Sequence, residues 1–344
     1  MGKERKYSME KHVKRIGILT SGGDAPGMNA AVRAVVRTAV TNGMECIGIR
    51  RGWNGLIHSD FFCMNANSVG HIINKGGTIL YTARSEEFRE ASGRAKALST
   101  CKLLGLDAIV AIGGDGTFRG ALELSRQAAE NGQSLQVVGI PATIDNDIGC
   151  SHYTIGFDTA CNTAISCIDR LRDTMQSHER CSVVEVMGRH AGYLALYVGI
   201  AVGATAVLIP ERKLDFEEDV INKIRRARLS GSTHYMIVVA EGAGNAMEIS
   251  NRIQEEIGLD PRVTVLGHIQ RGGIPTARDR ESATRMGYRA VHTILENKGN
   301  RIVSIMDGRL SDLDMEEALQ MVKTFQMERY QVLESTLYNY NSIP

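Results

Sequence analysis

Residues 108–120 read AIVAIGGDGTFRG, and this stretch does most to predict the fold. Its first five residues are apolar and partly β-branched, which is typical of a buried strand. Gly113, Gly114 and Gly116 follow around Asp115, with Thr117 next, so the strand leads through a glycine loop into a helix. Such a loop lets a phosphate approach the backbone, with the threonine as a donor and the aspartate near magnesium. A turn with an N-capping side chain is the alternative, and we favour the phosphate loop.

Apolar runs of this kind recur and alternate with helix-like stretches, which predicts an α/β fold with parallel sheets covered on both faces. The predicted strands are 16–19, 46–49, 108–112, 137–140, 183–186, 206–209, 235–240 and 263–266. Helices are predicted at 27–43 and 216–231, and the C-terminal stretch 315–335 also has a helical pattern. Glycine clusters follow several strands, at 21–23, 188–192, 241–244 and 268–273, where doubly wound folds bind ligands.

The composition is that of an ordinary globular protein. The 344 residues are 43% hydrophobic and 23% charged, with a net charge of +1. Because no overall field favours a polyanion, we expect no nucleic-acid or membrane partner. The seven cysteines show no metal spacing, the charged N-terminus shows no signal peptide, and no apolar run is long enough to span a membrane. We expect a cytoplasmic protein with reduced thiols.

Residues 139–149, GIPATIDNDIG, place two carboxylates just after a predicted strand. Buried acids are costly unless they are paired or bound to a cation. In an extended backbone, Asp145 and Asp147 would point to one face while Asn146 points to the other. An Asx turn is the simpler explanation for these residues alone. Thr143 beside them, and the glycine-acid loop upstream, favour a functional site.

Other loops carry neither of two familiar nucleotide motifs. The stretch around SGGD, residues 21–24, is either a phosphate loop or a tight turn, and it matches neither a Walker A loop nor GxGxxG. Several arginines flank predicted strands or glycine turns, where the planar guanidinium suits phosphate, although a solvated surface is the usual explanation for a single arginine.

The motifs taken together resemble the 6-phosphofructokinases, specifically the bacterial ATP-dependent type. SGGDAPGMNAAVR, GGDGT, PATIDNDI, YTIGFDTA, RLRDT, SVVEVMGRHAGY and TVLGHIQRGG stand in that family's order between about residues 15 and 320. The resemblance implies two Rossmann-like domains with the active site in the cleft between them. It places the larger, nucleotide-binding domain at 1–156 plus 270–320, and the smaller, sugar-phosphate-binding domain at 157–269 plus 321–344.

The implied reaction is phosphoryl transfer from ATP to the 1-hydroxyl of fructose 6-phosphate, with Mg²⁺, in glycolysis. By resemblance, Asp145 is the general base beside Thr143, Arg189 stabilises the transition state, and Asp115 and Asp147 are the carboxylates near magnesium. The ATP-binding positions are Gly23, Trp53, Arg84, Arg89, Asp115, Gly116, Thr117 and Gly120. Trp53 stands where the family often has tyrosine, and Ser85 replaces a common phenylalanine.

The sugar phosphate is expected to meet Thr143, Asp145, Met187, Gly188, Arg189 and Glu241, with His268 and Arg271 clamping its 6-phosphate. Arg180 and Arg262 match arginines that the family supplies from a neighbouring subunit. The resemblance therefore implies a homotetramer whose sites are shared between subunits.

Two further expectations come from departures within the family. Gly116 and Ala142 stand where pyrophosphate-dependent relatives carry aspartate and lysine, which favours ATP as the donor. Arg33, Arg37, Arg172 and His234 match effector-site positions, but Ala66, His71, Thr205 and the turn at 230–233 lack the family's charges there. We therefore predict altered or absent effector control.

Four alternatives stay open at this point. Two are enzymes of the same family, namely a pyrophosphate-dependent phosphofructokinase and a kinase of another ketohexose phosphate such as tagatose 6-phosphate. The third is a non-catalytic nucleotide-binding subunit, which the retained Asp145, Arg189 and Asp115 disfavour. The fourth is a Rossmann-type oxidoreductase, which the absence of GxGxxG disfavours.

Overall fold

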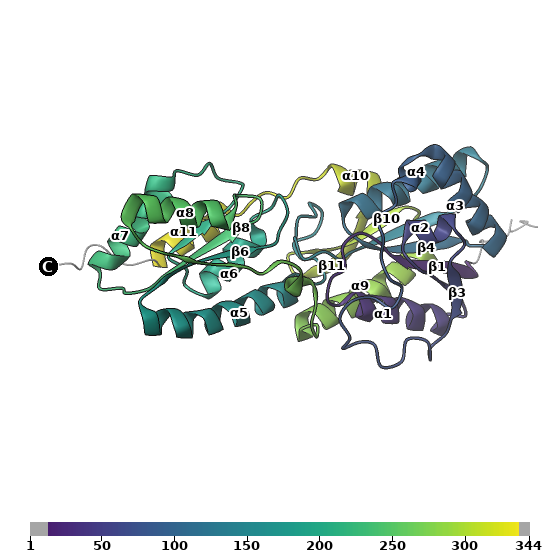
Figure 1. Cartoon of the computed structure of the whole chain (residues 1–344). Coiled ribbons are helices and arrows are strands. Elements are labelled where there is room, and N and C mark those ends of the chain that lie inside the picture. The colour runs from purple at the N-terminus through teal and green to yellow at the C-terminus, as the bar shows by residue number, and fades with distance from the viewer. Residues whose placement is uncertain (1–12, 337–344) are drawn as a thin grey trace, which may run out of the picture.

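The computed structural model describes residues 13–336, which form two lobes, each built around its own sheet (Figure 1). The charged N-terminal stretch and the outer ends of the two expected domains, at residues 1 and 344, lie outside the described residues. The larger sheet has seven strands in the order β11-β10-β5-β4-β1-β2-β3. They are β1 (Arg15–Thr20), β2 (Glu45–Ile49), β3 (Phe61–Met64), β4 (Ala108–Gly113), β5 (Gln136–Pro141), β10 (Arg301–Met306) and β11 (Arg309–Asp314).

The smaller sheet has four strands in the order β7-β8-β6-β9, all of them parallel. They are β6 (Cys181–Val186), β7 (Ala206–Leu208), β8 (Tyr235–Ala240) and β9 (Arg262–Val265). The central strands of the larger sheet are also parallel, and its two edge strands, β3 and β11, run antiparallel to their neighbours. The prediction of an α/β fold with mainly parallel sheets is therefore confirmed.

Helices cover both faces of each sheet (Figure 1). On the larger sheet, one face carries α1 (Met28–Thr41) and α9 (Ala277–Leu295), and the other carries α2 (Trp53–Ile57), α3 (Ala91–Leu104), α4 (Asp115–Glu130) and α10 (Met315–Gln320). The smaller sheet has α5 (Phe157–His178) and α6 (Tyr193–Ala201) on one face, and α7 (Asn222–Leu229) and α8 (Ala246–Ile257) on the other. The last helix, α11 (Met327–Thr336), packs against α6.

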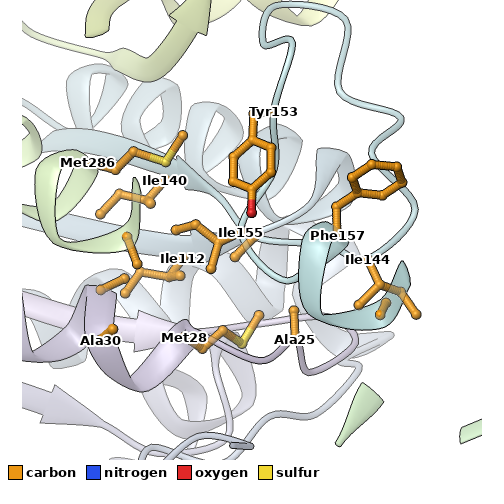
Figure 2. Packing of buried hydrophobic residues seen from close by; sticks show 14 of the residues in the cluster. Ala25, Met28, Ala30, Ile112, Ile140, Ile144, Tyr153, Ile155, Phe157 and Met286 are labelled. Carbon is orange, nitrogen blue, oxygen red and sulfur yellow. The ribbon is translucent and has the colours of Figure 1, made fainter. Parts of the chain in front are cut away.

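One apolar core contains buried residues from both sheets and from the helices α1, α5, α6 and α9. Ile112 and Ile140 from the larger sheet meet Met28 of α1, Met286 of α9 and Phe157 at the start of α5 (Figure 2). All five side chains are buried. Because this layer joins the two lobes, residues from both can be held in fixed positions around a shared site.

Side-chain caps mark the beginnings of three described helices, α8, α9 and α10. The Asn245 side chain accepts the Met247 amide at 2.8 Å at the start of α8, and Asp314 accepts the Glu316 amide at 2.9 Å at the start of α10. Such caps satisfy amides that have no partner within the helix. The region predicted as a helix at 216–231 contains a π-helical turn, η2 (Glu217–Ile221), before α7.

The helix predicted for 315–335 is wrong in its middle. The structure has α10 and α11 there, separated by six residues, 321–326, that lie outside any helix. We call residues 321–326 the strap, because they connect α10, packed on α4, to α11, packed on α6. The strap thus passes from the larger lobe to the smaller one.

All seven cysteines are free thiols and five of them are buried, which agrees with the expectation of reduced, packed cysteines. Within residues 13–336, no helix combines the length and the apolar character that a membrane crossing requires.

Candidate active site

Two glycine loops meet at the carboxyl ends of neighbouring parallel strands. The loop after β1 carries Ser21, and the loop after β4 leads into α4. Thr117 Oγ1 donates to the Ser21 carbonyl at 3.1 Å, which ties the two loops together. A Cβ on Gly113 would lie 2.4 Å from that same oxygen, so only glycine permits this approach.

A cavity of about 490 Å³ opens between these loops and the end of β5. Its walls include all eight positions expected to bind ATP, together with Thr143, Asp145, Asp147, Arg189 and Arg271. Most of these residues belong to the larger lobe, and Arg189 and Arg271 come from segments that follow strands of the smaller sheet. The lobes therefore share one cavity.

The first turn of α4 forms one wall of this cavity. Asp115, Gly116 and Thr117 are the first three residues of the helix, where backbone amides without helical partners favour an anion. No atom lies within 4 Å of the place where a Cβ on Gly116 would be, so the backbone there is open to the cavity. Asp115 is half-exposed and forms an ion pair with Arg119 one turn later, with Nε 2.6 Å from Oδ2.

An aromatic pair forms the far wall. The Trp53 and Phe88 rings stack in parallel, with centroids 4.6 Å apart and planes 7° from parallel. Both side chains are buried and line the cavity. Trp53 Nε1 has no hydrogen-bond partner among the residues that the structure describes, so this indole N–H remains available to a ligand. The apolar wall and the single donor suit a planar base.

Asp145 and Asp147 both line the cavity, but the expected reason was wrong. The backbone is not extended there, because Asn146 has φ 52°, in the left-handed region. A turn follows Thr143, whose Oγ1 accepts the Asp145 amide at 3.2 Å. Thr154 Oγ1 donates to the Thr143 carbonyl at 2.6 Å and fixes the start of the turn. Left-handed geometry is tolerated better by asparagine than by most residues.

The charge of Asp145 is poorly compensated. Its Oδ1 is buried and has no hydrogen-bond partner within residues 13–336. Burial raises the pKa of Asp145 and the neighbouring Asp147 carboxylate raises it further, whereas Arg271 and Arg189 lower it. A carboxylate with a raised pKa and a free oxygen is well suited to accept a proton from a ligand.

Asp147 is set apart from Asp145 by its neighbours. Burial raises the pKa of Asp147, and the nearby Asp115 carboxylate also raises it, while Arg189 and Lys323 lower it. Asp115 and Asp147 therefore interact across the cavity as two like charges. A divalent cation between them would offset that repulsion.

Arg189 owes its place to the loop after β6. It has φ 57°, and its amide donates to Glu241 Oε1 at 2.6 Å. The Gly188 amide donates to the same oxygen at 3.2 Å, and the Met187 amide donates to Gln270 Oε1 at 2.9 Å. Glu241 and Gln270 follow β8 and β9, so the ends of three strands hold this loop. The cavity lining does not include three residues that were expected to meet the sugar phosphate, namely Met187, Gly188 and Glu241. They hold the loop that carries Arg189.

Arg271 and His268 are both in the 3₁₀ helix η3 (Gly267–Arg271), but only Arg271 lines the cavity. Arg271 Nη1 donates to the Asp24 carbonyl at 3.2 Å. A Cβ on Gly23 would lie 2.6 Å from that nitrogen, so the arginine packs directly against the first glycine loop.

Arg180 and Arg262 lie at the other end of the smaller sheet. Arg180 directly precedes β6 and Arg262 begins β9, whereas the loops of Arg189 and Arg271 follow these strands. The six residues of β6 span about 20 Å and the four residues of β9 about 13 Å, and neither arginine lines the cavity of its own chain. Both are exposed, and Arg262 forms an ion pair with Asp260 at 3.2 Å.

The four effector-site positions do not line the cavity. Arg33 and Arg37 are on α1, and Arg37 together with burial lowers the pKa of Arg33. Arg172 on α5 donates to the Val202 carbonyl, and His234 precedes β8.

Comparison with known proteins agrees with this arrangement. The phosphofructokinase family profile matches residues 15–294. The chain belongs to the phosphofructokinase family. Its sequence is 50% identical over 320 residues to the ATP-dependent 6-phosphofructokinase of Alkaliphilus metalliredigens, covering 93% of this chain and 98% of that one. A Clostridium botulinum protein of the same name is 49% identical over the same share of both chains.

A solved phosphofructokinase from Saccharomyces cerevisiae superposes with a TM-score of 0.88 at 34% identity. The match covers 94% of this chain and 50% of the yeast chain, so this phosphofructokinase-family chain spans half the length of that relative.

The cavity lining also includes residues that the motifs did not reveal, among them Phe88, Arg94, Arg119 and Glu123. Two of them could have been found, because Arg119 and Glu123 follow Asp115 at intervals of four and share its face of α4. No comparable spacing marks Phe88, whose role depends on its contact with the distant Trp53.

Proposed function

We propose that this chain is a cytoplasmic ATP-dependent 6-phosphofructokinase that transfers the γ-phosphoryl group of ATP to the 1-hydroxyl of fructose 6-phosphate. The observation that carries the proposal is the free, buried Oδ1 of Asp145 in a cavity whose other walls are glycine loops and an aromatic pair. A base, phosphate-binding loops and a base-stacking wall are the parts that this reaction needs. The names of the curated relatives support the choice of substrates.

Asp145 would take the proton of the sugar hydroxyl as its oxygen attacks the phosphorus. Thr143, whose side chain holds the Asp145 amide, would keep the carboxylate aimed at that proton. Arg189 and Arg271 would bring positive charge to the phosphoryl oxygens, where charge stabilisation matters more than covalent chemistry. The backbone amides at the start of α4 would bind the remaining phosphates.

The carboxylates suit magnesium. Asp115 and Asp147 offer hard oxygen ligands across one cavity, and Mg²⁺ takes only one or two protein carboxylates besides water and phosphate. Within residues 13–336 no cluster of three or more His, Cys, Asp or Glu side chains could hold a metal. When bound, Mg²⁺ would neutralise phosphate charge. Asp115 would then exchange its ion pair with Arg119 for the cation.

ATP is favoured over pyrophosphate at two positions. Gly116 leaves open space beside the first turn of α4, where an α-phosphate can lie without meeting a carboxylate. Ala142 is buried at the end of β5 and supplies no charge. A chain that turns over only pyrophosphate would overturn this assignment.

We also propose the domain and subunit organisation. The nucleotide domain would comprise 1–156 plus 270–320, and the sugar domain 157–269 plus 321–344. Arg180 and Arg262 lie at the strand ends away from the cavity of their own chain, so they would serve the site of a neighbour in a homotetramer. With the effector-site charges reduced as described, control by nucleoside diphosphate or phosphoenolpyruvate would be altered or absent.

A coupled assay for fructose 1,6-bisphosphate, run in parallel with ATP and with pyrophosphate, tests the reaction. We expect product with ATP only, and no product with either donor would refute the proposal. Tagatose 6-phosphate in place of fructose 6-phosphate tests the sugar.

Complementation tests the shared site. Asp145→Ser removes the part of a shared site that one chain supplies, and Arg262→Ala removes the part that its neighbour supplies. Mixed oligomers of the two inactive variants should therefore contain some sites with both parts intact. We expect activity to return when the two chains are co-expressed, and not when separately assembled oligomers are mixed. No recovery in co-expressed oligomers would count against sharing.

A further inference from the structure

The strap lies directly on the turn that carries Asp145 and Asp147. A Cβ on Gly149 would be 1.9 Å from the Met321 carbonyl oxygen and 3.2 Å from the Lys323 amide nitrogen. No side chain fits there, so the strap and the turn are in backbone contact. Since the strap joins α10 to α11, this contact places the turn between elements of both lobes.

Two residues of the strap are partly buried, namely Phe325, which packs against the Tyr193 ring, and Lys323. The neighbouring Val322 is 88% exposed, whereas Lys323 is half-buried. Lys323 Nζ donates to Asn146 Oδ1 at 2.9 Å and lies 5.2 Å from the centre of the Tyr193 ring. The Tyr193 hydroxyl in turn donates to the Lys323 carbonyl at 3.2 Å. Tyr193 begins α6, so the lysine connects the turn to the smaller lobe.

Asn146 is the residue through which this contact can act. It sits between the two carboxylates, is buried, and has φ 52°. Its Nδ2 donates to the His152 carbonyl at 3.4 Å, and its Oδ1 lies 3.3 Å from Thr154 Oγ1. A side chain held from three directions fixes the left-handed backbone, and that backbone sets where Asp145 and Asp147 point.

We propose that Lys323 is a positioning residue for phosphoryl transfer, which holds the Asp145–Asp147 turn in its active geometry by binding Asn146 and anchors that turn to Tyr193 in the smaller lobe. This proposal rests on the proposed function, because kcat is measured for that reaction. Lys323 does not line the cavity; it binds Asn146 directly, and its charge also lowers the pKa of Asp147, which burial raises. A charge-assisted hydrogen bond of 2.9 Å to a buried oxygen is strong enough for this role.

The test compares Lys323→Met, which keeps the stem and removes the ammonium, with Lys323→Arg, which keeps a cationic donor. Val322→Ala is the matched control on the exposed side of the same strap. We expect Lys323→Met to lower kcat by roughly 10- to 100-fold, the effect of misplacing a catalytic group by about an ångström. The KM for ATP should change by less than about twofold. Lys323→Arg should recover part of kcat, and the control should match the parent.

A double-mutant cycle separates positioning from general destabilisation. Asn146→Gly keeps the left-handed backbone accessible while removing the side chain that the lysine binds. If Lys323 acts through Asn146, Lys323→Met will have little further effect on kcat in the Asn146→Gly chain. Equal losses in both backgrounds, or a parent-like kcat for Lys323→Met, would overturn the proposal.

Hydrogen exchange provides a readout that needs no turnover. Lys323→Met should accelerate exchange of the amides at 144–149 relative to Val322→Ala, because the turn loses a contact that holds it. Unchanged exchange would overturn the proposal. An inactive parent would refute the proposed function instead, and the exchange result would still decide whether Lys323 holds the turn.

Discussion

Placing a carboxylate at position 116 tests the donor assignment with little structural disturbance. Gly116 is in the first turn of α4, has no left-handed backbone, and has open space where a Cβ would lie. Gly116→Asp therefore fits without strain. It should also leave stability unchanged or improved, because aspartate at a helix N-terminus contributes about 0.3–1 kcal/mol. What changes is the charge that a bound nucleotide meets.

The expected size follows from Coulomb's law. Two unit charges roughly 5 Å apart interact by about 3 kcal/mol at an effective dielectric constant near 20. The cavity is open to solvent, so screening lowers this repulsion to about 1–2 kcal/mol. The KM for ATP should therefore rise roughly 5- to 30-fold, with a smaller rise at high salt.

Gly116→Asn is the matched control, because it has the same shape without the charge. We would measure the KM for ATP of both variants at saturating fructose 6-phosphate and at two salt concentrations, with thermal unfolding to verify the fold. The reasoning is wrong if the two variants raise KM equally, since the effect would then be steric. It is equally wrong if Gly116→Asp binds ATP as the parent does.

Three further predictions concern the base, an ion cluster and the thiols. Asp145→Ser should lower kcat by at least about 10²-fold, because it removes the proton acceptor; near-normal turnover would remove Asp145 from that role. Burial raises the pKa of Asp312, but hydrogen bonds from cations led by Arg289 outweigh it and leave that pKa lowered. The stabilising effect of the Asp312 carboxylate should thus be complete above its pKa in the unfolded chain and lost as pH falls through its pKa in the folded chain. Asp312→Asn should reduce the free energy of unfolding at pH 7 by ~1–3 kcal/mol. Urea titrations at several pH values measure both, and an equally stable variant would contradict the assignment. At pH 8 a thiol reagent should label exposed Cys63 first, and mass spectrometry would identify the labelled residue. Cys46 should react only on unfolding, because burial raises its pKa to about 12. Early labelling of Cys46 would contradict this prediction.

The sequence predicted the buried strands well, because each is a short apolar run that ends in a turn signal. β4 and β8 are buried along their whole length, and their predicted ranges differ from the observed ones by at most one residue. Three strands of the larger sheet, β3, β10 and β11, were missed, whereas β7 and β9 at the edges of the smaller sheet were predicted. β11, RLSDLD, has only two apolar residues and is only half-buried, so its pattern is weak without knowledge of its partner β10.

The parts of the site that escaped prediction depend on distant contacts. Residues 321–326 have no helix-breaking residue, yet the strap leaves the helix where it meets Gly149. The left-handed turn at Asn146 likewise depends on a backbone carbonyl six positions away and a side chain 177 positions away. Motifs can identify which residues belong to such a site. The backbone conformation that orients their side chains depends on tertiary packing, which the local sequence does not encode.

The return of the chain to the larger sheet bears on how the protein is made. β10 pairs with β5 through Val138 and Arg301, so two neighbouring strands are separated by nearly half of the polypeptide. During synthesis the edge of β5 emerges long before its partner, and an unpaired strand edge is prone to join another chain. A nascent larger lobe must therefore wait, with that edge exposed, until the smaller lobe has been translated. Fragments that stop before residue 301 should depend on chaperones or aggregate, however complete their nucleotide-binding loops are.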